Sequence, residues 1–512
     1  MGGFTLDSIL TKNLASQGAS EGRVALIFRD REYTFKELDA RAERLATGLL
    51  EHGFAKGDRM CVLSQNRTEW FELFFALARI GGVLVPVNYL LKPKEVQHIV
   101  EDSGARWFLG EDELWSTVDG FRPATDPAIR YISLGKEQSD STNYEALCAE
   151  ASTPRPVVDV QPDDLVLLQY TSGTTGFPKG AMHTHTTVLW NTIHQIPDFH
   201  ISRDDVHLII PAMCWAAGFH SFTLATMWAG GTVVLNPSRN FEAVEFCRTV
   251  ARHRVTKTIL VPSVLRRVLD SDAIERHDLS SLNLVLSGGE PVPVESIEEW
   301  HRRVPTCALV QGYGMGEFPT LMLFLTATDA VRKAGAAGKA CLVAQVRVVE
   351  PSFEDTRVGD IGEIVVLSPA CMVGYYGKAE ATDQTFFNGW MRTGDLAHVD
   401  AEGFVHIAGR AKEMIISGGL NVYPAEVERV LLSVDGVAEA AVVGVPDKQW
   451  GEIIQAFVIV APGHSISVDD LNSRCREELA NYKVPRRWTI RDEPLPRTTS
   501  GKLQRHLLTT AE

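Results

Sequence analysis

The stretch from Tyr170 to Gly180 reads YTSGTTGFPKG and lies between a short apolar run, Val166 to Gln169, and a helix-length segment that starts near His183. Its three glycines let the backbone turn its N–H groups inward, its four Ser and Thr hydroxyls add donors, and Lys179 adds a fixed positive charge. A Walker loop would need Gly before the Lys and Ser or Thr after it, and here a Pro and a Gly occupy those places. The stretch therefore predicts a polyphosphate-binding loop that is not a P-loop, in preference to a solvated linker.

Around this loop, a short β-branched run, a turn and a helix-length segment alternate through most of the first four hundred residues. Glu72 to Ile80, for example, is helix-like and leads through two glycines into an apolar strand, Val83 to Val87. Such alternation predicts parallel sheets with helices on both faces. From Ala340 to Val366 the pattern changes to short strands and turns, and after Arg410 it changes to a compact α+β unit of about one hundred residues.

We therefore expect an α/β fold with a large N-terminal domain of doubly wound sheets, a small β subdomain and a small α+β C-terminal domain. The expected bounds are 1–410 for the N-terminal domain, with an internal boundary near 152–164 and the β subdomain at about 335–408, and 411–512 for the C-terminal domain. In the C-terminal domain, a helix that starts after Ser467 has a capping signature. We interpret its apolar stripe as core: Val468, Leu471, Cys475, Leu479 and Tyr482.

Composition and charge exclude several kinds of partner. Fifty Lys and Arg against 65 Asp and Glu give the 512-residue chain a net charge of −15, which disfavours nucleic acid and anionic lipid. The eight cysteines contain no CxxC pair and suggest a reduced, cytoplasmic protein, and MGGFTLDSIL shows no export signal or lipid anchor. Val206 to Leu235 lacks any acidic or basic side chain, but Pro211, Gly218 and Gly230-Gly231 break it into a strand, a buried helix and a strand. We expect no membrane span.

The loop at Tyr170 to Gly180 resembles the phosphate-binding motif of the adenylate-forming superfamily, which includes acyl-CoA synthetases, peptide-synthetase adenylation domains and firefly luciferases. Further segments resemble that family's motifs in the same order and extend the resemblance over nearly the whole chain. They are an adenine-binding turn (Ser287 to Pro291, SGGEP), an adenine and magnesium segment (Gln311 to Glu317, QGYGMGE), a ribose-binding segment (Trp390 to Asp395, WMRTGD), a hinge (Gly409 to Lys412, GRAK) and a C-terminal catalytic loop (Thr499 to Lys502, TSGK).

The resemblance implies an ATP-dependent ligase that joins a carboxylic acid to CoA and uses ATP, Mg²⁺ and coenzyme A. Catalytic roles fall on Lys502, which would reach the substrate carboxylate and the α-phosphate, on Glu317, which would bind magnesium, and on Lys179. The ATP- or AMP-binding residues are Thr171, Ser172, Gly173, Thr174, Thr175, Gly176, Gly288, Gly289, Glu290, Gly312, Tyr313, Gly314, Asp395 and Arg410. Lys412 would be the hinge between the two domains, and Ser417, Gly418 and Gly419 would line the tunnel for the CoA thiol.

Two positions near the chemistry depart from the family pattern. Gly316 stands where a Thr usually precedes the Glu, so backbone or water would have to replace that side chain as donor. Trp215 stands where a His is frequent; its ring, with Ala216, Gly218 and Met315, suggests an acyl pocket for a hydrophobic acid, either fatty, aryl or bulky and cyclic. Simple filling of the core by Trp215 explains the same residues equally well.

Two other functions remain open at this point. One is an adenylating enzyme that loads the phosphopantetheine of a carrier protein, and the other is a degenerate adenylate-binding module without turnover. Retention of Lys502, Glu317 and Lys179 argues against the second. His183 and His185 form a candidate metal pair, which we interpret as helix-entry residues because no carboxylate cluster accompanies them. The expected partners are the acid, ATP and CoA, and a homodimer is left open.

Overall fold

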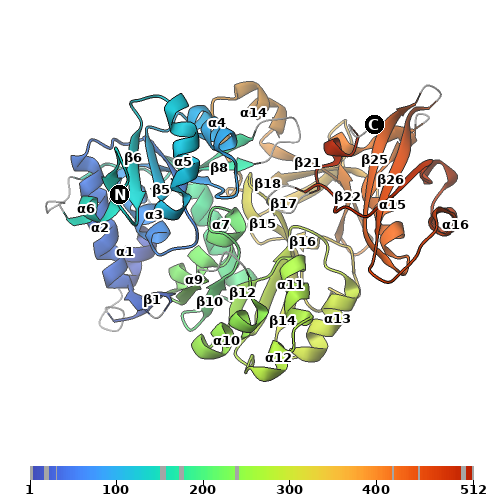
Figure 1. The fold of residues 1–512 in the computed structure, drawn as a ribbon, viewed down its shortest axis with the longest axis horizontal. Coiled ribbons are helices and arrows are strands. Elements are labelled where there is room, and N and C mark those ends of the chain that lie inside the picture. The colour runs from blue at the N-terminus through green and yellow to red at the C-terminus, as the bar shows by residue number, and fades with distance from the viewer. Residues whose placement is uncertain are drawn as a thin grey trace. The chain divides into compact units, whose positions relative to one another are not determined.

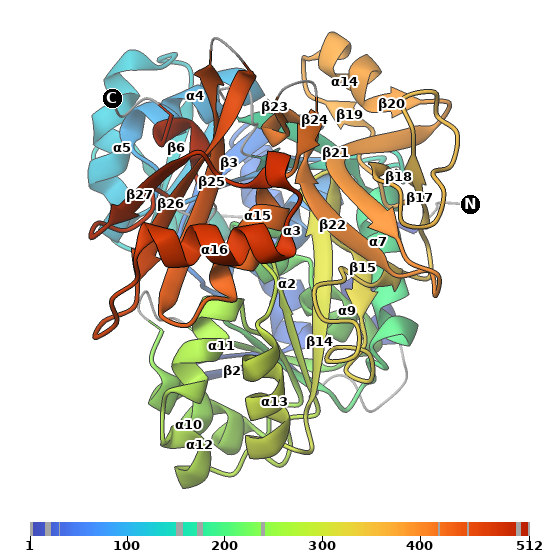
Figure 2. The same cartoon turned by 90° about the vertical axis from the view of Figure 1, so that its right-hand side faces the viewer.

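The computed structural model describes residues 4–15, 22–29, 31–149, 157–171, 178–236, 241–417, 420–447, 450–497 and 503–509. The chain divides into two compact units: Met1–Val346 with Val366–Met391, and Arg347–Val365 with Arg392–Glu512. Figure 1 and Figure 2 show the helices and strands of both units. Of the helices in the described part of the chain, none combines the length and the apolar character that crossing a bilayer requires.

The first unit contains an eight-stranded sheet whose central strands are parallel, as the sequence predicts. Antiparallel strands close the edge that carries the glycine-rich loop. The strand order is β19 (Gly374–Tyr375), β9 (Lys179–Thr184), β8 (Leu165–Thr171), β4 (Val83–Val87), β3 (Arg59–Leu63), β5 (Trp107–Glu111), β6 (Arg130–Leu134) and β7 (Thr142–Asn143).

Both faces of this sheet are covered by helices, because successive side chains of a strand point to opposite faces. In β3, Met60 and Val62 pack into a core with α2 (Phe35–Glu51) and α3 (Glu69–Ile80). Cys61 and Leu63 pack into a second core with α4 (Pro93–Ser103) and α5 (Trp115–Phe121). The doubly wound arrangement predicted from the strand and helix alternation is therefore confirmed.

A nine-stranded sheet completes the first unit and is parallel from β14 to β1. Its order is β16 (Lys339–Ala340), β15 (Phe318–Leu325), β14 (Ala308–Met315), β13 (Leu284–Gly288), β12 (Lys257–Ile259), β10 (Val206–Ile209), β11 (Thr232–Leu235), β1 (Val24–Phe28) and β2 (Arg31–Thr34). Its helices include α7 (His185–Asp198), α10 (Ala243–His253), α11 (Pro262–Leu269), α12 (Ala273–Arg276) and α13 (Val294–Arg303), the last four of which form one core with its strands.

Within the described residues, five further α-helices belong to the first unit: α1 (Ser8–Ala15), α6 (Tyr144–Ala149), α8 (Ala216–Phe219), α9 (Thr223–Ala229) and α14 (Ala379–Thr385). The uncharged run from Val206 to Leu235 forms strands at both ends, as predicted, but its middle divides into α8 (Ala216–Phe219) and α9. The helix expected at Glu72 begins earlier, at Glu69, and Val83 to Val87 is the strand β4 as predicted.

Two five-stranded sheets, smaller than the two sheets above, contain the strands of the second unit. One contains β17 (Gln345–Val349), β18 (Gly362–Leu367), β21 (Trp390–Val399) and β20 (Phe386–Phe387), with β22 (Val405–Arg410) paired to β21. Of this sheet, β20 and the ends of β17, β18 and β21 fall within the residue bounds of the first unit. The other contains β24 (Leu420–Val422), β23 (Ile415–Ser417), β26 (Gly451–Val460) and β25 (Val437–Asp447), with β27 (Arg487–Arg491) parallel to β26. Helices α15 (Pro424–Leu432) and α16 (Val468–Glu478) pack on this second sheet.

Helix α16 begins where its capping signature predicts, because the Ser467 hydroxyl accepts the Asp470 N–H and the Asp470 carboxylate accepts the Ser467 N–H. Its predicted apolar stripe is only partly correct. Leu471, Cys475 and Leu479 are buried, whereas Val468 and Tyr482 are exposed. Val468 is the first residue of α16, and Tyr482 lies beyond its last residue. Neither belongs to the buried stripe of the helix.

Candidate active site

Several residues assigned to the site from the sequence lie outside the described residues. They are Ser172, Gly173, Thr174, Thr175 and Gly176 of the glycine-rich loop, Gly418 and Gly419 of the expected thiol tunnel, and Lys502. Residues 152–156 of the expected internal boundary also lie outside. The loop's two flanks are described, and they show that it connects two antiparallel strands, with Thr171 of β8 opposite Lys179 of β9.

This connection corrects one expectation. The segment from Lys179 to Thr184 was expected to lead directly into a helix near His183, but it forms the strand β9, and α7 begins at His185. Ala181 and His183 lie two residues apart on the same face of this strand, and both are buried. The Thr184 side chain then caps α7 by accepting the Thr187 N–H.

Glu317 lies in the tight connection between β14 and β15, and its side chain is 7% exposed. Its Oε1 accepts hydrogen bonds from the Thr171 hydroxyl at 3.0 Å and from the Tyr375 hydroxyl at 2.8 Å. The carbonyl of Glu317 accepts the Met372 N–H at 2.8 Å. Within the described residues Oε2 has no hydrogen-bond partner, so the carboxylate is fixed through one oxygen and offers the other to a ligand.

Tyr375 connects this carboxylate to the basic end of the loop. Its ring lies 5.1 Å from the Lys179 Nζ, in a cation–π contact, while its hydroxyl contacts Glu317. Tyr375 belongs to β19, which pairs with β9 and therefore lies beside the loop's second strand. Sequence reasoning missed this residue. The pair Gly374-Tyr375 gave no motif, and only strand pairing brings it to Glu317.

His183 holds the backbone of the same connection. Its Nε2–H donates to the Gly316 carbonyl at 2.8 Å, and complete burial lowers the pKa of His183 to about 4. The imidazole is thus neutral at pH 7 and serves as a hydrogen-bond donor. His185 is the first residue of α7, as the interpretation of a helix entry expects, whereas His183 belongs to β9. The His185 Nδ1 accepts the Leu6 N–H.

The predicted adenine-binding segments meet edge to edge in the nine-stranded sheet. Gly288 at the end of β13 is in register with Gly312 of β14, and a Cβ on Gly288 would lie less than 3.0 Å from the Gly312 carbonyl oxygen. A Cβ on Gly314 would likewise overlap the Thr320 carbonyl. These glycines are required by close backbone approach. Glu290 and Gly289 are exposed beyond β13, and Tyr313 is half-buried in β14.

Trp215 precedes the short helix α8 and is half-buried against the core shared with α3. Gly218 is buried, and a Cβ there would overlap the Ala212 carbonyl. The segment is tied to β8 because the Gln169 side-chain amide donates to the Cys214 carbonyl at 3.4 Å. Gln169 also lies beside Gly316. The same side chain is therefore next to both the Trp215 segment and the connection that carries Glu317. Ala216 and Met315 are half-buried.

In the second unit, Asp395 and Arg410 lie opposite each other on β21 and β22. The Arg410 Nε lies 2.6 Å from the Asp395 Oδ1, and Asp395 is 5% exposed. Gly394 has φ of +73°, and its N–H donates to Glu363. The sequence placed these two residues in one site from separate motifs, and strand pairing brings them into direct contact. Lys412 follows in an exposed single turn, Ala411–Glu413, and Ser417 ends β23, where it is buried.

The residues on both sides of the TSGK segment are held by specific contacts. Arg497 and Leu503 form a β-bridge, and the Arg505 guanidinium contacts the carboxylates of Glu413 at 2.7 Å and Glu428 at 2.9 Å. Burial raises the pKa of Glu428, and the charge of Arg505 opposes that rise. Sequence reasoning missed Arg505. Lys483 is paired with Glu426 at 2.6 Å.

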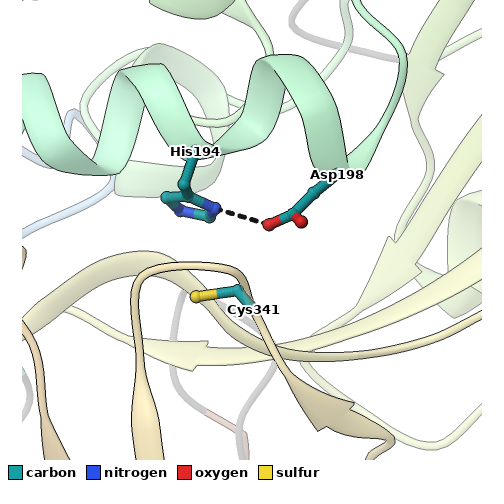
Figure 3. Close-up of side chains that lie close together, drawn as sticks. All are labelled: His194, Asp198 and Cys341. Atoms are coloured by element: carbon teal, nitrogen blue, oxygen red, sulfur yellow. Dashed lines mark hydrogen bonds and ion pairs between the residues drawn. The ribbon is translucent and has the colours of Figure 1, made fainter.

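One cluster of potential metal ligands lies elsewhere in the first unit. Figure 3 shows His194 and Asp198 on α7 and Cys341 on the segment after β16, with ligand atoms within 4.8 Å of one another. The His194 Nδ1 and the Leu342 N–H both hydrogen-bond to Asp198 Oδ2. Burial raises the pKa of Cys341 to about 12. Three donors among the described residues fall short of the four in a closed zinc site, and we interpret the cluster as a buried link between α7 and that segment.

Comparisons with known proteins agree with this geometry. The AMP-binding enzyme family matches residues 15–376, and the AMP-binding enzyme C-terminal domain matches residues 426–502. A feruloyl-CoA synthase from an Amycolatopsis species is 38% identical over 470 residues, which are 92% of each chain. An indoleacetate–CoA ligase from Aromatoleum aromaticum is 35% identical over 491 residues, which are 95% of each chain. The crystal structure of the anthranilate CoA ligase AuaEII in complex with anthranoyl-AMP superposes with a TM-score of 0.88 at 27% identity, covering 99% of this chain and 97% of that one.

The chain belongs to the AMP-binding enzyme family, and the solved structures that it resembles are adenylate-forming ligases. The expected fold class, a large α/β N-terminal domain and a smaller C-terminal domain, is thereby confirmed.

Proposed function

We propose that this protein is an AMP-forming acid–CoA ligase. It activates a hydrophobic carboxylic acid, either fatty, aryl or bulky and cyclic, as an acyl-adenylate with release of pyrophosphate, and then transfers the acyl group to the CoA thiol. The observation that carries the proposal is the fixed Glu317 carboxylate, held by Thr171 and Tyr375 beside Lys179. The named CoA ligases among its relatives support the same reaction.

The first half-reaction needs positive charge near the reacting phosphate. A carboxylate is a poor acyl donor because its leaving group would be an oxide, so its oxygen attacks the α-phosphorus and pyrophosphate leaves. Lys179 and the glycine-rich loop would bind the β- and γ-phosphates. Glu317 fits Mg²⁺ because its Oε2 is a hard oxygen donor without a hydrogen-bond partner in the described part of the chain. The bound ion would neutralise charge on the phosphate oxygens.

The remaining roles are assigned from matching positions. The Asp395 carboxylate, aligned by Arg410, would accept hydrogen bonds from the ribose hydroxyls. Gly288, Gly289, Glu290, Gly312, Tyr313 and Gly314 would form the adenine site, and Trp215, Ala216, Gly218 and Met315 the acyl pocket. Lys502 would contact the substrate carboxylate and the α-phosphate.

The second half-reaction requires a clear path for the thiol, so the domain that carries Lys502 has to move. We assign the N-terminal domain to 1–410, with the β subdomain at about 335–408, and the mobile C-terminal domain to 411–512. The exposed turn at Lys412 would be the hinge, and Ser417 to Gly419 would line the thiol path. The eight cysteines, all buried and unpaired, fit a reducing compartment, and we place the protein in the cytoplasm.

The proposal is tested by mass spectrometry of the purified protein with Mg-ATP, CoA and a pool of fatty, aryl and polycyclic acids. We expect an acyl-CoA product, reduced about 10²- to 10³-fold by Lys502→Ala and unchanged by Lys136→Ala, a surface lysine outside the site. An acyl-adenylate without thioester would indicate a carrier-protein thiol as acceptor. Binding of ATP without either product would indicate an adenylate-binding module and would contradict the ligase function.

A further inference from the structure

Position 316 immediately precedes Glu317, and its glycine is explained by sterics rather than by backbone conformation. Its φ lies outside the left-handed region, so the backbone itself would accept a side chain. A Cβ on Gly316 would, however, lie less than 3.0 Å from the Thr171 Cγ2, with the Gln169 Cγ next at 3.5 Å. The Thr171 methyl therefore fills the volume that a side chain at position 316 would need.

The methyl cannot move aside without a consequence for Glu317. Thr171 is branched at Cβ, so one χ1 rotation moves both Cγ2 and Oγ1. The Oγ1 donates to Glu317 Oε1 at 3.0 Å, and a rotation that clears space for residue 316 would break that hydrogen bond. The backbone cannot yield readily either, because the Gly316 carbonyl is held by His183 and the Glu317 carbonyl by the Met372 N–H.

We propose that positions 171 and 316 share one side-chain volume, and that the Thr171 hydroxyl on β8 positions the Glu317 carboxylate. Thr171 is thus a positioning residue for the Glu317 carboxylate. Because Gly316 has no side chain, the Thr171 side chain has room for the rotamer that makes this hydrogen bond. This inference rests on the proposed function, because it assigns Glu317 to the Mg-ATP site. It explains why residue 316 has no side chain in this protein.

A double-mutant cycle separates the Thr171 methyl from the Thr171 hydroxyl. Gly316→Ala is measured in three backgrounds: the parent, Thr171→Ser, which removes Cγ2 and keeps the hydroxyl, and Thr171→Val, which keeps the methyl and removes the hydroxyl. The readouts are acid-dependent exchange of pyrophosphate into ATP and the Mg²⁺ concentration that gives half-maximal exchange. Thermal unfolding of each variant, and of Gly22→Ala, whose Cβ would contact nothing within 4 Å, controls for general destabilisation.

In the parent background, we expect Gly316→Ala to lower the exchange rate about tenfold or more and to raise the Mg²⁺ requirement, since misplacing a catalytic group by about 1 Å can cost 10²-fold. In the Thr171→Ser background, the same substitution should cost about twofold or less, because residues that compete for one volume are not additive. In the Thr171→Val background, Gly316→Ala should leave the exchange rate low, because the methyl is still present and the hydroxyl is missing. Equal costs of Gly316→Ala in the parent and Thr171→Ser backgrounds would overturn the inference.

The inference and the proposed function fail in distinguishable ways. If the parent protein shows no exchange with any acid, the proposed function fails, and the cycle is then read from Mg²⁺-dependent ATP binding by calorimetry. If the parent exchanges normally and Gly316→Ala leaves both the rate and the Mg²⁺ requirement unchanged, the shared volume is wrong while the ligase function stands.

Discussion

At the scale of single residues, the site depends on how each charged group is oriented by neutral neighbours. Glu317 carries the charge, but two hydroxyl groups decide where its carboxylate points. Tyr375 has a double role, because its ring contacts the Lys179 ammonium while its hydroxyl contacts Glu317. It should therefore matter for adenylation although it carries no charge.

We expect Tyr375→Phe to lower the adenylation rate about 10- to 100-fold, because a hydrogen bond to a charged group contributes about 1.5–3 kcal/mol. The ring remains over Lys179 in this variant, so phosphate binding should change less than the Mg²⁺ requirement. Tyr376→Phe is the matched control, since the neighbouring Tyr376 contacts Arg59 through its ring. Pyrophosphate exchange at varied Mg²⁺ measures the effect, and equal rates for the two variants would contradict the assigned role.

At the scale of elements, the residues of the candidate site lie where strands end and short connections begin. Thr171 ends β8, Glu317 connects β14 and β15, and Asp395 and Arg410 face each other across a hairpin. Helices α2, α7 and α16 begin after a Thr or Ser whose side chain accepts a backbone N–H of the first turn. In α16, the Ser467 hydroxyl satisfies an N–H that would otherwise lack an intrahelical partner.

Loss of that cap should loosen α16 without affecting the fold elsewhere. Ser467→Ala is expected to destabilise the helix by about 1 kcal/mol, which corresponds to about fivefold faster hydrogen exchange of its amides. Ser467→Thr keeps a hydroxyl and should exchange nearly as the parent does. Exchange in Ser467→Ala at the parental rate would show that the capping hydrogen bond contributes nothing to α16.

At the scale of the whole molecule, buried histidines make stability depend on pH. Burial lowers the pKa of His183, His185 and His207 to about 4 and that of His220 to about 3. In the unfolded chain these groups titrate near their ordinary value, about 6.5. Above that pH both states are neutral, and below it only the unfolded chain takes up protons. The free energy of unfolding is therefore not reduced by these histidines above pH 6.5, and it falls as the pH is lowered from 6.5 toward 4.

We expect the free energy of unfolding to fall between pH 6.5 and pH 4.5, with a slope of about 1.4 kcal/mol per pH unit for each such histidine. Urea unfolding at a series of pH values measures this slope. His220→Phe removes one group and should flatten the slope by about a quarter, whatever it does to the absolute stability. A slope unchanged in that variant would mean that His220 is protonated in the folded chain.

The sequence by itself determined the fold class, the strands β4 and β11, the cap of α16 and the ordered motifs, because these depend on local periodicity, turn chemistry and residue type. It could not determine Tyr375, His183 or Arg505 as partners of the site, since each reaches it through strand pairing or packing between distant segments. It also misplaced the start of the helix after the glycine-rich loop, because a short strand and a helix entry look alike in so short a segment. Only the tertiary structure showed why residue 316 is glycine, since the atom that excludes a side chain there belongs to Thr171, on another strand.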